Sequence, residues 1–258
     1  MHKTEIEERF DLLDASIERN LVIRHAWRQG ENRACLLLTL APEIESEEAK
    51  DGKFYVVARC PSELLPLWLA GLTPEIDDRG TEEAWPAMIR RYARVVRRAA
   101  LTLNSEQWRF VWVQFQARVI RKIAERHGLT KLQAESLEYI ERTGQTLLPD
   151  KLVVKMKAAN YGKNAPPPQS VERAVSNEIL HLEMFHWKIL GAQAGSYRTI
   201  AVVQVSRLRA FFLGIANDPI TEARYESEAW DIYANLLLDT IEAALPPEGP
   251  VDGQSNPV

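Results

Sequence analysis

Helix start and stop signals are the feature that most constrains how this chain folds. Two capping boxes, in which residues three apart satisfy each other's free backbone N–H groups, stand close together, each with a glycine at the expected helix end. These signals are Asn104 with Gln107, Gly128, Thr130 with Gln133, and Gly144. They predict one helix from about 104 to 127 and a second from 130 to 144, joined by a three-residue turn.

Apolar residues recur at helical spacing along most of the remaining chain. The stretches 4–20, 61–72, 81–103, 170–185 and 218–245 each place apolar side chains on one stripe, and a shorter helix is expected to begin near Asp150. The sequence therefore predicts a predominantly helical, all-α protein.

A few segments favour other structure. Proline and glycine predict loops at 74–80 and 161–169, and the β-branched run at 54–58 favours a short strand. Glycines between two apolar, β-prone runs predict a β-hairpin over 187–204, with its turn inside 191–197.

Charge is distributed unevenly, although the net charge is only −4. Eleven Lys or Arg stand against two acids between 86 and 131, whereas nine acids stand against one base from 217 onward. Either the basic and acidic helices pair inside the protein, or the basic surface binds a polyanion. Composition alone favours internal pairing.

Several classes of protein are excluded by composition. No apolar run reaches the ~18 residues that a membrane-spanning helix needs, and the acidic N-terminus does not resemble a signal peptide, so the cytoplasm is the expected location. Cys35 and Cys60 stand alone, which argues against a disulfide framework or a zinc site. Since no phosphate-binding glycine loop or activated nucleophile is recognisable, we expect neither catalysis nor a cofactor.

The order of elements in the second half resembles the MarR family of transcriptional regulators. The first two helices of that family are similar to WRFVWVQFQARVIRKIAERHGLTKLQAESLEYIERTG, its recognition helix to SVERAVSNEILHLEMFHWKI, and its wing to GAQAGSYRTIAVVQVS. The resemblance covers about 140 of 258 residues. The chain departs from the family by an insertion at 165–169, by the lack of the acidic-then-basic wing signature, and by a first hundred residues without counterpart.

The resemblance implies an all-α winged helix-turn-helix with a small β-hairpin wing, preceded by an N-terminal helical unit. The expected parts are a helical unit at 1–103, a winged-helix-like domain with flanking dimerisation helices at 104–245, and a disordered tail at 246–258. The protein is then expected to be a non-catalytic, homodimeric regulator that binds double-stranded DNA.

Site residues follow from that resemblance. Polar residues near the start of the recognition helix would reach base edges, and lysines would meet phosphates. The expected base-reading residues are Ser170, Arg173 and Asn177. The expected phosphate and wing contacts are Lys131, Lys151, Lys155, Lys188 and Arg198. Glu172 and Glu178 count against DNA contact, because phosphates repel carboxylates.

Two alternative functions come from other classes. A helical protein-interaction factor would use the basic helix at 90–98 to bind an acidic partner. A ferritin-like metal protein would use the E-x-x-H pair of Glu178 and His181, but such a site needs a second E-x-x-H pair and further glutamates. No other histidine follows a glutamate by three residues, so the sequence predicts no metal site.

Overall fold

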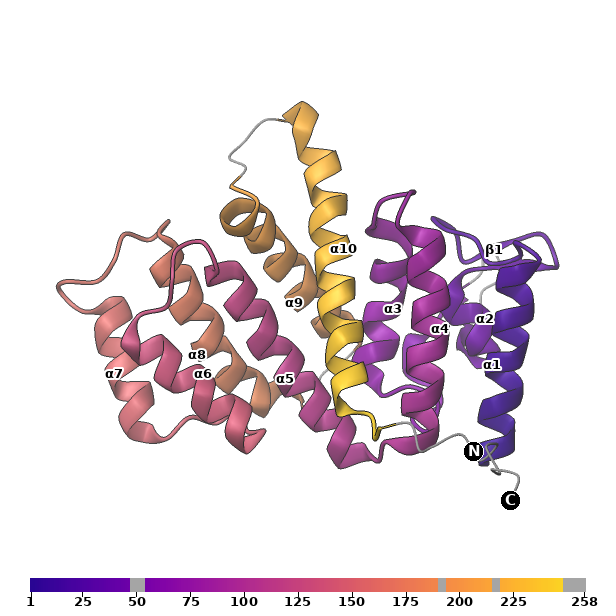
Figure 1. Cartoon of the computed structure of the whole chain (residues 1–258), viewed down its shortest axis with the longest axis horizontal. Coiled ribbons are helices and arrows are strands. Elements are labelled where there is room, and N and C mark those ends of the chain that lie inside the picture. Colours follow the sequence, from indigo (N-terminus) through magenta and orange to yellow (C-terminus); the bar gives the residue numbers. More distant parts are fainter. Residues whose placement is uncertain (47–53, 190–193, 215–218, 248–258) are drawn as a thin grey trace, which may run out of the picture.

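The computed structural model describes residues 1–46, 54–189, 194–214 and 219–247, and the predicted all-α character is confirmed (Figure 1). The helices of this described part are α1 (Lys3–Glu18), α2 (Leu36–Leu40), α3 (Leu67–Arg79), α4 (Trp85–Thr102), α5 (Ser105–Ala124), α6 (Lys131–Thr143), α7 (Asp150–Tyr161), α8 (Val171–Ile189), α9 (Ala194–Arg207) and α10 (Pro219–Ala244). Shorter elements are the antiparallel pairs β1 (Arg28–Gln29) with β2 (Arg33–Ala34) and β3 (Glu45–Ser46) with β4 (Phe54–Tyr55), the 3-10 turns η1 (Pro42–Ile44) and η2 (Val57–Arg59), and the π-helical turn η3 (Leu208–Phe212).

The helices are arranged around α10, which runs through the middle of the molecule (Figure 1). The helices α6, α7 and α8 gather at one end, and α1 and α2 lie at the other. Because α10 packs against α3, α4, α5 and α9, buried hydrophobic residues form one cluster that extends from α1 to α10. The predicted boundary between 1–103 and 104–245 falls inside this shared core. Most of the predicted tail, 248–258, lies outside the described residues.

The local helix signals are confirmed. Both capping boxes form as predicted, at the starts of α5 and α6. Gly144 ends α6 in the left-handed conformation, with φ of +64°. A side chain there would also collide with Phe110, because a Cβ atom would lie 2.5 Å from its Cδ2 atom. The left-handed backbone at the end of α6 therefore favours glycine, and a side chain there would also have to displace the exposed ring of Phe110.

The predicted hairpin over 187–204 is wrong. The helix α8 continues to Ile189 and α9 begins at Ala194, while 190–193 lie outside the described residues. Tyr197, Ile200 and Val205 are buried at helical spacing, because α9 packs against α3. This tertiary burial overrides the β propensity of the valine-rich run. The antiparallel pairs that are present, β1–β2 and β3–β4, come before α3 in the chain.

The predicted loop at 74–80 is also wrong, since α3 continues through Pro74 to Arg79. The buried side chain of Asp77 gives this last turn fixed partners. Its carboxylate accepts hydrogen bonds from the backbone N–H of Leu36, at 3.0 Å, and from the indole Nε1 of Trp85, at 2.8 Å. The last turn of α3 is therefore held by groups outside the helix, 8 and 41 residues away in the sequence.

Asp77 is expected to make stability depend on pH. Burial raises the pKa of its carboxyl from 3.8 to about 6, although the bonds from Trp85 and Leu36 oppose the shift. Because the folded pKa lies above the unfolded one, the stabilising contribution is complete below pH ~4 and is lost as the pH rises through about 6. A shift of this size corresponds to roughly 3 kcal/mol.

Urea unfolding of the wild type and of Asp77→Asn between pH 4 and pH 7 measures this effect. The stability of the wild type relative to Asp77→Asn should fall across that range. Asp150→Asn, at the exposed start of α7, serves as the control and should keep the pH dependence of the wild type. Parallel pH profiles for the wild type and Asp77→Asn would contradict the prediction.

Candidate functional site

The basic helix α4 pairs inside the protein. Arg91 Nη2 lies 2.6 Å from Asp239 Oδ1 and 2.5 Å from Glu242 Oε2, both on α10. Arg97 makes an ion pair of 2.6 Å with Asp11 on α1. A further arginine of the same helix, Arg94, reaches Glu242. Part of the charge asymmetry therefore reflects internal pairing. A protein-interaction function through α4 stays a prediction, because Arg90 is exposed and makes no ion pair with a described residue.

The residues predicted for the wing do not lie on a hairpin. Arg198 belongs to α9, and its Nε atom lies 2.6 Å from the Oε1 atom of Glu75 on α3. Glu75 is nearly buried, so this pair helps to hold α9 against α3. Lys188 belongs to α8, but its side chain lies outside the described residues.

Two of the predicted base-reading residues contact the loop that precedes α8. The Ser170 hydroxyl accepts a hydrogen bond from the backbone N–H of Arg173, at 3.3 Å, and donates one to the carbonyl of Pro167, at 2.7 Å. The Arg173 guanidinium donates to the carbonyl of Pro166 and lies 5.4 Å from the ring centroid of Tyr161. Ser170 thus caps α8, and Arg173 packs against the end of α7.

Asn177 and its surroundings show that α8 is packed on several sides. Its Oδ1 atom accepts hydrogen bonds from Asn160 Nδ2, at 2.6 Å, and from the hydroxyl of Tyr161, at 2.7 Å. Residues 174–176 and 178–180 are buried. The start of α8 therefore faces α7, and a role for α8 in reading base edges stays a prediction.

The neighbouring helix α7 presents a free polar surface instead. Its inner side buries Leu152, Val153 and Met156, and Val154 on the outer side is 66% exposed. Four exposed lysines surround that outer side, and we call them the α7 lysine face: Lys151, Lys155, Lys157 and Lys163. Within the described part of the chain, none of the four makes an ion pair. Of the predicted phosphate contacts, Lys151 and Lys155 belong to this face, and exposed Lys131 begins α6.

Two glutamates of α6 reduce the net positive charge of this region. A shallow groove between α6 and α7 is lined by Lys151 and Lys155, by Arg142, and by Glu135 and Glu138 of α6. Lys151 and Lys155 therefore lie beside acids of α6, whereas Lys157 and Lys163 do not line the groove. Sequence reasoning missed Lys157 and Lys163, although both lie in the same short segment as the lysines that it named.

A buried polar network connects four helices in the centre of the molecule. Glu178 of α8 forms an ion pair with Arg207 of α9. Gln204 Nε2 donates hydrogen bonds to Gln116 Oε1 of α5, at 2.7 Å, and to Glu178 Oε2, at 3.3 Å. The hydroxyl of Tyr233 on α10 donates to Gln204 Oε1. Burial lowers the pKa of Arg207. Nothing in the sequence pattern marks the two glutamines as buried partners.

The E-x-x-H pair belongs to this network. His181 Nδ1 lies 3.8 Å from Glu178 Oε1, and the guanidinium of Arg207 contacts the same carboxylate. A ferritin-like site would need other carboxylates near that position. Among the described residues, no three His, Cys, Asp or Glu side chains form a group that could hold a metal ion.

These observations define an all-α protein with a lysine-rich helix surface at one end, which makes no ion pair with the described residues, and a charged network buried in its centre. Comparison with protein-family models, with curated proteins and with solved structures finds no match. The resemblance to the MarR family therefore stays a prediction. In the described part of the chain, no helix combines the length and the apolar character that crossing a membrane requires.

Proposed function

We propose that this protein binds double-stranded DNA through the α7 lysine face. The observation that carries the proposal is a contrast between two basic helices. Three arginines of α4, Arg91, Arg94 and Arg97, pair with acids of α1 and α10, whereas the lysines of α7 are exposed and make no ion pair within the described residues. Unpaired lysines on one surface supply the phosphate attraction that underlies non-specific DNA affinity.

The shape and chemistry of α7 fit this role. The helix is 12 residues long and lies at the outer end of the molecule, where a duplex has access to it (Figure 1). The small apolar side chains of Val154 and Ala158 lie among the lysines, which permits close approach and contact with thymine methyl groups. Lysines position a protein on the phosphate backbone without reading sequence. We therefore propose binding dominated by charge, with modest sequence preference.

This proposal keeps the helix-turn-helix part of the expected regulator and moves the main contact from α8 to α7. The helices α6, α7 and α8 pack against one another, as a helix-turn-helix unit requires. The wing is no longer part of the proposal, because the segment predicted to form it is helical. Formation of a homodimer stays a prediction.

Replacing three lysines of this face by glutamine tests the proposal. We expect the wild type to bind a 20-base-pair duplex at low salt and to lose affinity steeply as salt is added. The triple variant Lys151→Gln, Lys155→Gln and Lys157→Gln should bind about 100-fold more weakly at low salt. The slope of log affinity against log salt should become shallower by about 2 to 3, because three phosphate contacts are lost.

A variant with the same change in charge at the other end of the molecule is the control. It carries Lys3→Gln, Arg19→Gln and Arg33→Gln, all at exposed positions. Its DNA affinity should stay within about threefold of the wild type, since only local phosphate contacts matter strongly in salt. Absence of duplex binding by the wild type at low salt, or equal losses in the two triple variants, would overturn the proposal.

A further inference from the structure

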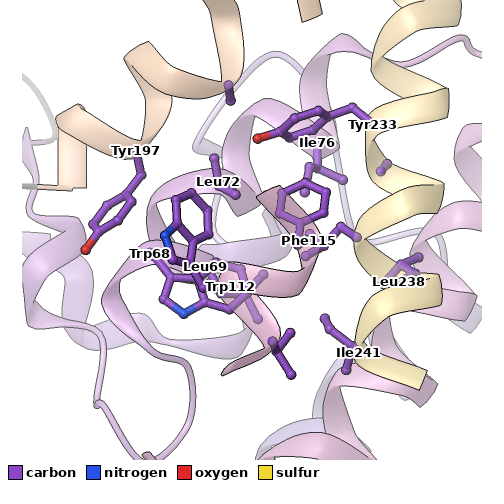
Figure 2. Packing of buried hydrophobic residues seen from close by; sticks show 14 of the residues in the cluster. Trp68, Leu69, Leu72, Ile76, Trp112, Phe115, Tyr197, Tyr233, Leu238 and Ile241 are labelled. Carbon is purple, nitrogen blue, oxygen red and sulfur yellow. The ribbon is translucent and has the colours of Figure 1, made fainter. Parts of the chain in front are cut away.

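A cavity of about 400 Å³ lies between α3, α5, α9 and the segment that follows α6. Four aromatic side chains form much of its wall, and each is at least 94% buried: Trp68, Trp108, Trp112 and Tyr197. Figure 2 shows Trp68, Trp112 and Tyr197 close together at one edge of the hydrophobic core. The Trp68 ring centroid lies 5.2 Å from that of Trp112, and the Trp112 centroid lies 5.4 Å from that of Tyr197. The cavity falls in the size range of small-molecule sites.

Few polar residues line this cavity, and one buried polar atom in its wall has no hydrogen-bond partner among the described residues. Trp68 Nε1 is buried and has no hydrogen-bond partner. A buried N–H group without an acceptor is costly, so buried donors are normally paired. The charged residue in the wall is Arg109, which is exposed and makes no ion pair with any residue that the structure describes. Among the residues that the structure describes, no acidic side chain lines the cavity.

We propose that this cavity binds a flat aromatic carboxylate. The fused rings of such a ligand pack against the indole and phenol rings, and its carboxylate pairs with Arg109 at the mouth. The Trp68 indole, whose buried N–H has no partner, forms part of the wall against which the rings pack. A cation is disfavoured, because the charge in the wall is positive and a cation would meet no carboxylate there. This binding site is independent of the α7 lysine face.

The size and the lining of the cavity suggest a probe with two fused rings, such as 2-naphthoate. Calorimetric titration of the full-length protein should show saturable binding of 2-naphthoate and weaker binding of its neutral methyl ester. Acetate, which has the charge but no ring, should not bind. This set of probes separates recognition by the aromatic wall from simple attraction to one arginine.

Two matched variants on α5 complete the test. Arg109→Gln should weaken the binding of 2-naphthoate about 10-fold, because a charge-assisted hydrogen bond is lost, and should change the binding of the ester less than twofold. Arg118→Gln, which removes an arginine of the same helix outside the cavity, should change neither. Failure of 2-naphthoate to bind the wild type at millimolar concentration would overturn the proposal. Equal losses of affinity for the acid and for the ester in Arg109→Gln would also overturn the proposal.

Discussion

Replacing Arg207 by methionine is expected to lower the free energy of unfolding by about 3–5 kcal/mol. The Glu178 side chain is 5% exposed, and Arg207 supplies the positive charge next to it. Without the guanidinium, the carboxylate stays buried among α5, α8, α9 and α10, with the amide of Gln204 and the ring of His181 as its remaining neighbours. A buried charge without its partner costs far more than the pair itself contributes. Urea unfolding at pH 7, followed by circular dichroism, measures the loss.

The double variant Glu178→Gln with Arg207→Met separates the effect of charge from that of packing. It removes both charges, so it should recover most of the stability and lie within about 2 kcal/mol of the wild type. Arg198→Met is the matched control, because this arginine also pairs with a nearly buried glutamate, Glu75. Glu75 keeps its ion pair with Arg79, so the control should lose only about 1 kcal/mol. If the double variant is as unstable as Arg207→Met, the buried charge is not the cause.

Truncating Phe115 to alanine is expected to cost about 3–5 kcal/mol. Its side chain is fully buried on α5, and its ring centroid lies 4.8 Å from that of Tyr233 on α10 in an edge-to-face arrangement (Figure 2). Trp112 contacts it from the other side. Removing the ring leaves a cavity where α5 and α10 meet, and the surrounding helices are held by too many other contacts to close it completely.

Phe110→Ala is the control for this prediction. Phe110 lies on the same helix and loses the same atoms, but its side chain is 42% exposed. Its truncation should cost less than about 1 kcal/mol, since little buried surface is lost. Thermal and urea unfolding of the two variants should therefore differ clearly. Similar losses would show that α5 is not held to α10 through Phe115.

The candidate DNA-binding surface was only partly predictable. The short helix beginning near Asp150 was expected, and two lysines of its exposed face, Lys151 and Lys155, were expected to meet phosphates. The sequence did not show that α8 is packed on several sides, because its polar residues look the same whether they face solvent or α7. Asn177, for example, faces α7 because its side chain accepts a hydrogen bond from Tyr161 at the end of that helix, 16 residues earlier in the chain.

The aromatic cavity and the buried network were not predicted at all. Trp108 and Trp112 share a helix face, which in a sequence is indistinguishable from an ordinary core stripe. Their proximity to Trp68 and Tyr197 depends on how α3 and α9 pack against α5. Gln116 and Gln204 are 88 positions apart in the sequence, so no local sequence pattern predicts their hydrogen bond.

The sequence by itself determined the starts of α5 and α6, the end of α6 and the balance of charge. The capping boxes at Asn104 and Thr130 and the stop at Gly144 involve atoms within four residues, so their chemistry is complete in the local sequence. Where the local conformational preference and burial favour different structures, the tertiary structure determined the outcome. The valine-rich run became α9, and α3 continued through Pro74, because distant partners bury one helical face in each case. Such burial outweighs the small β preference of the valines and, at Pro74, a larger penalty of about 3 kcal/mol for proline inside a helix.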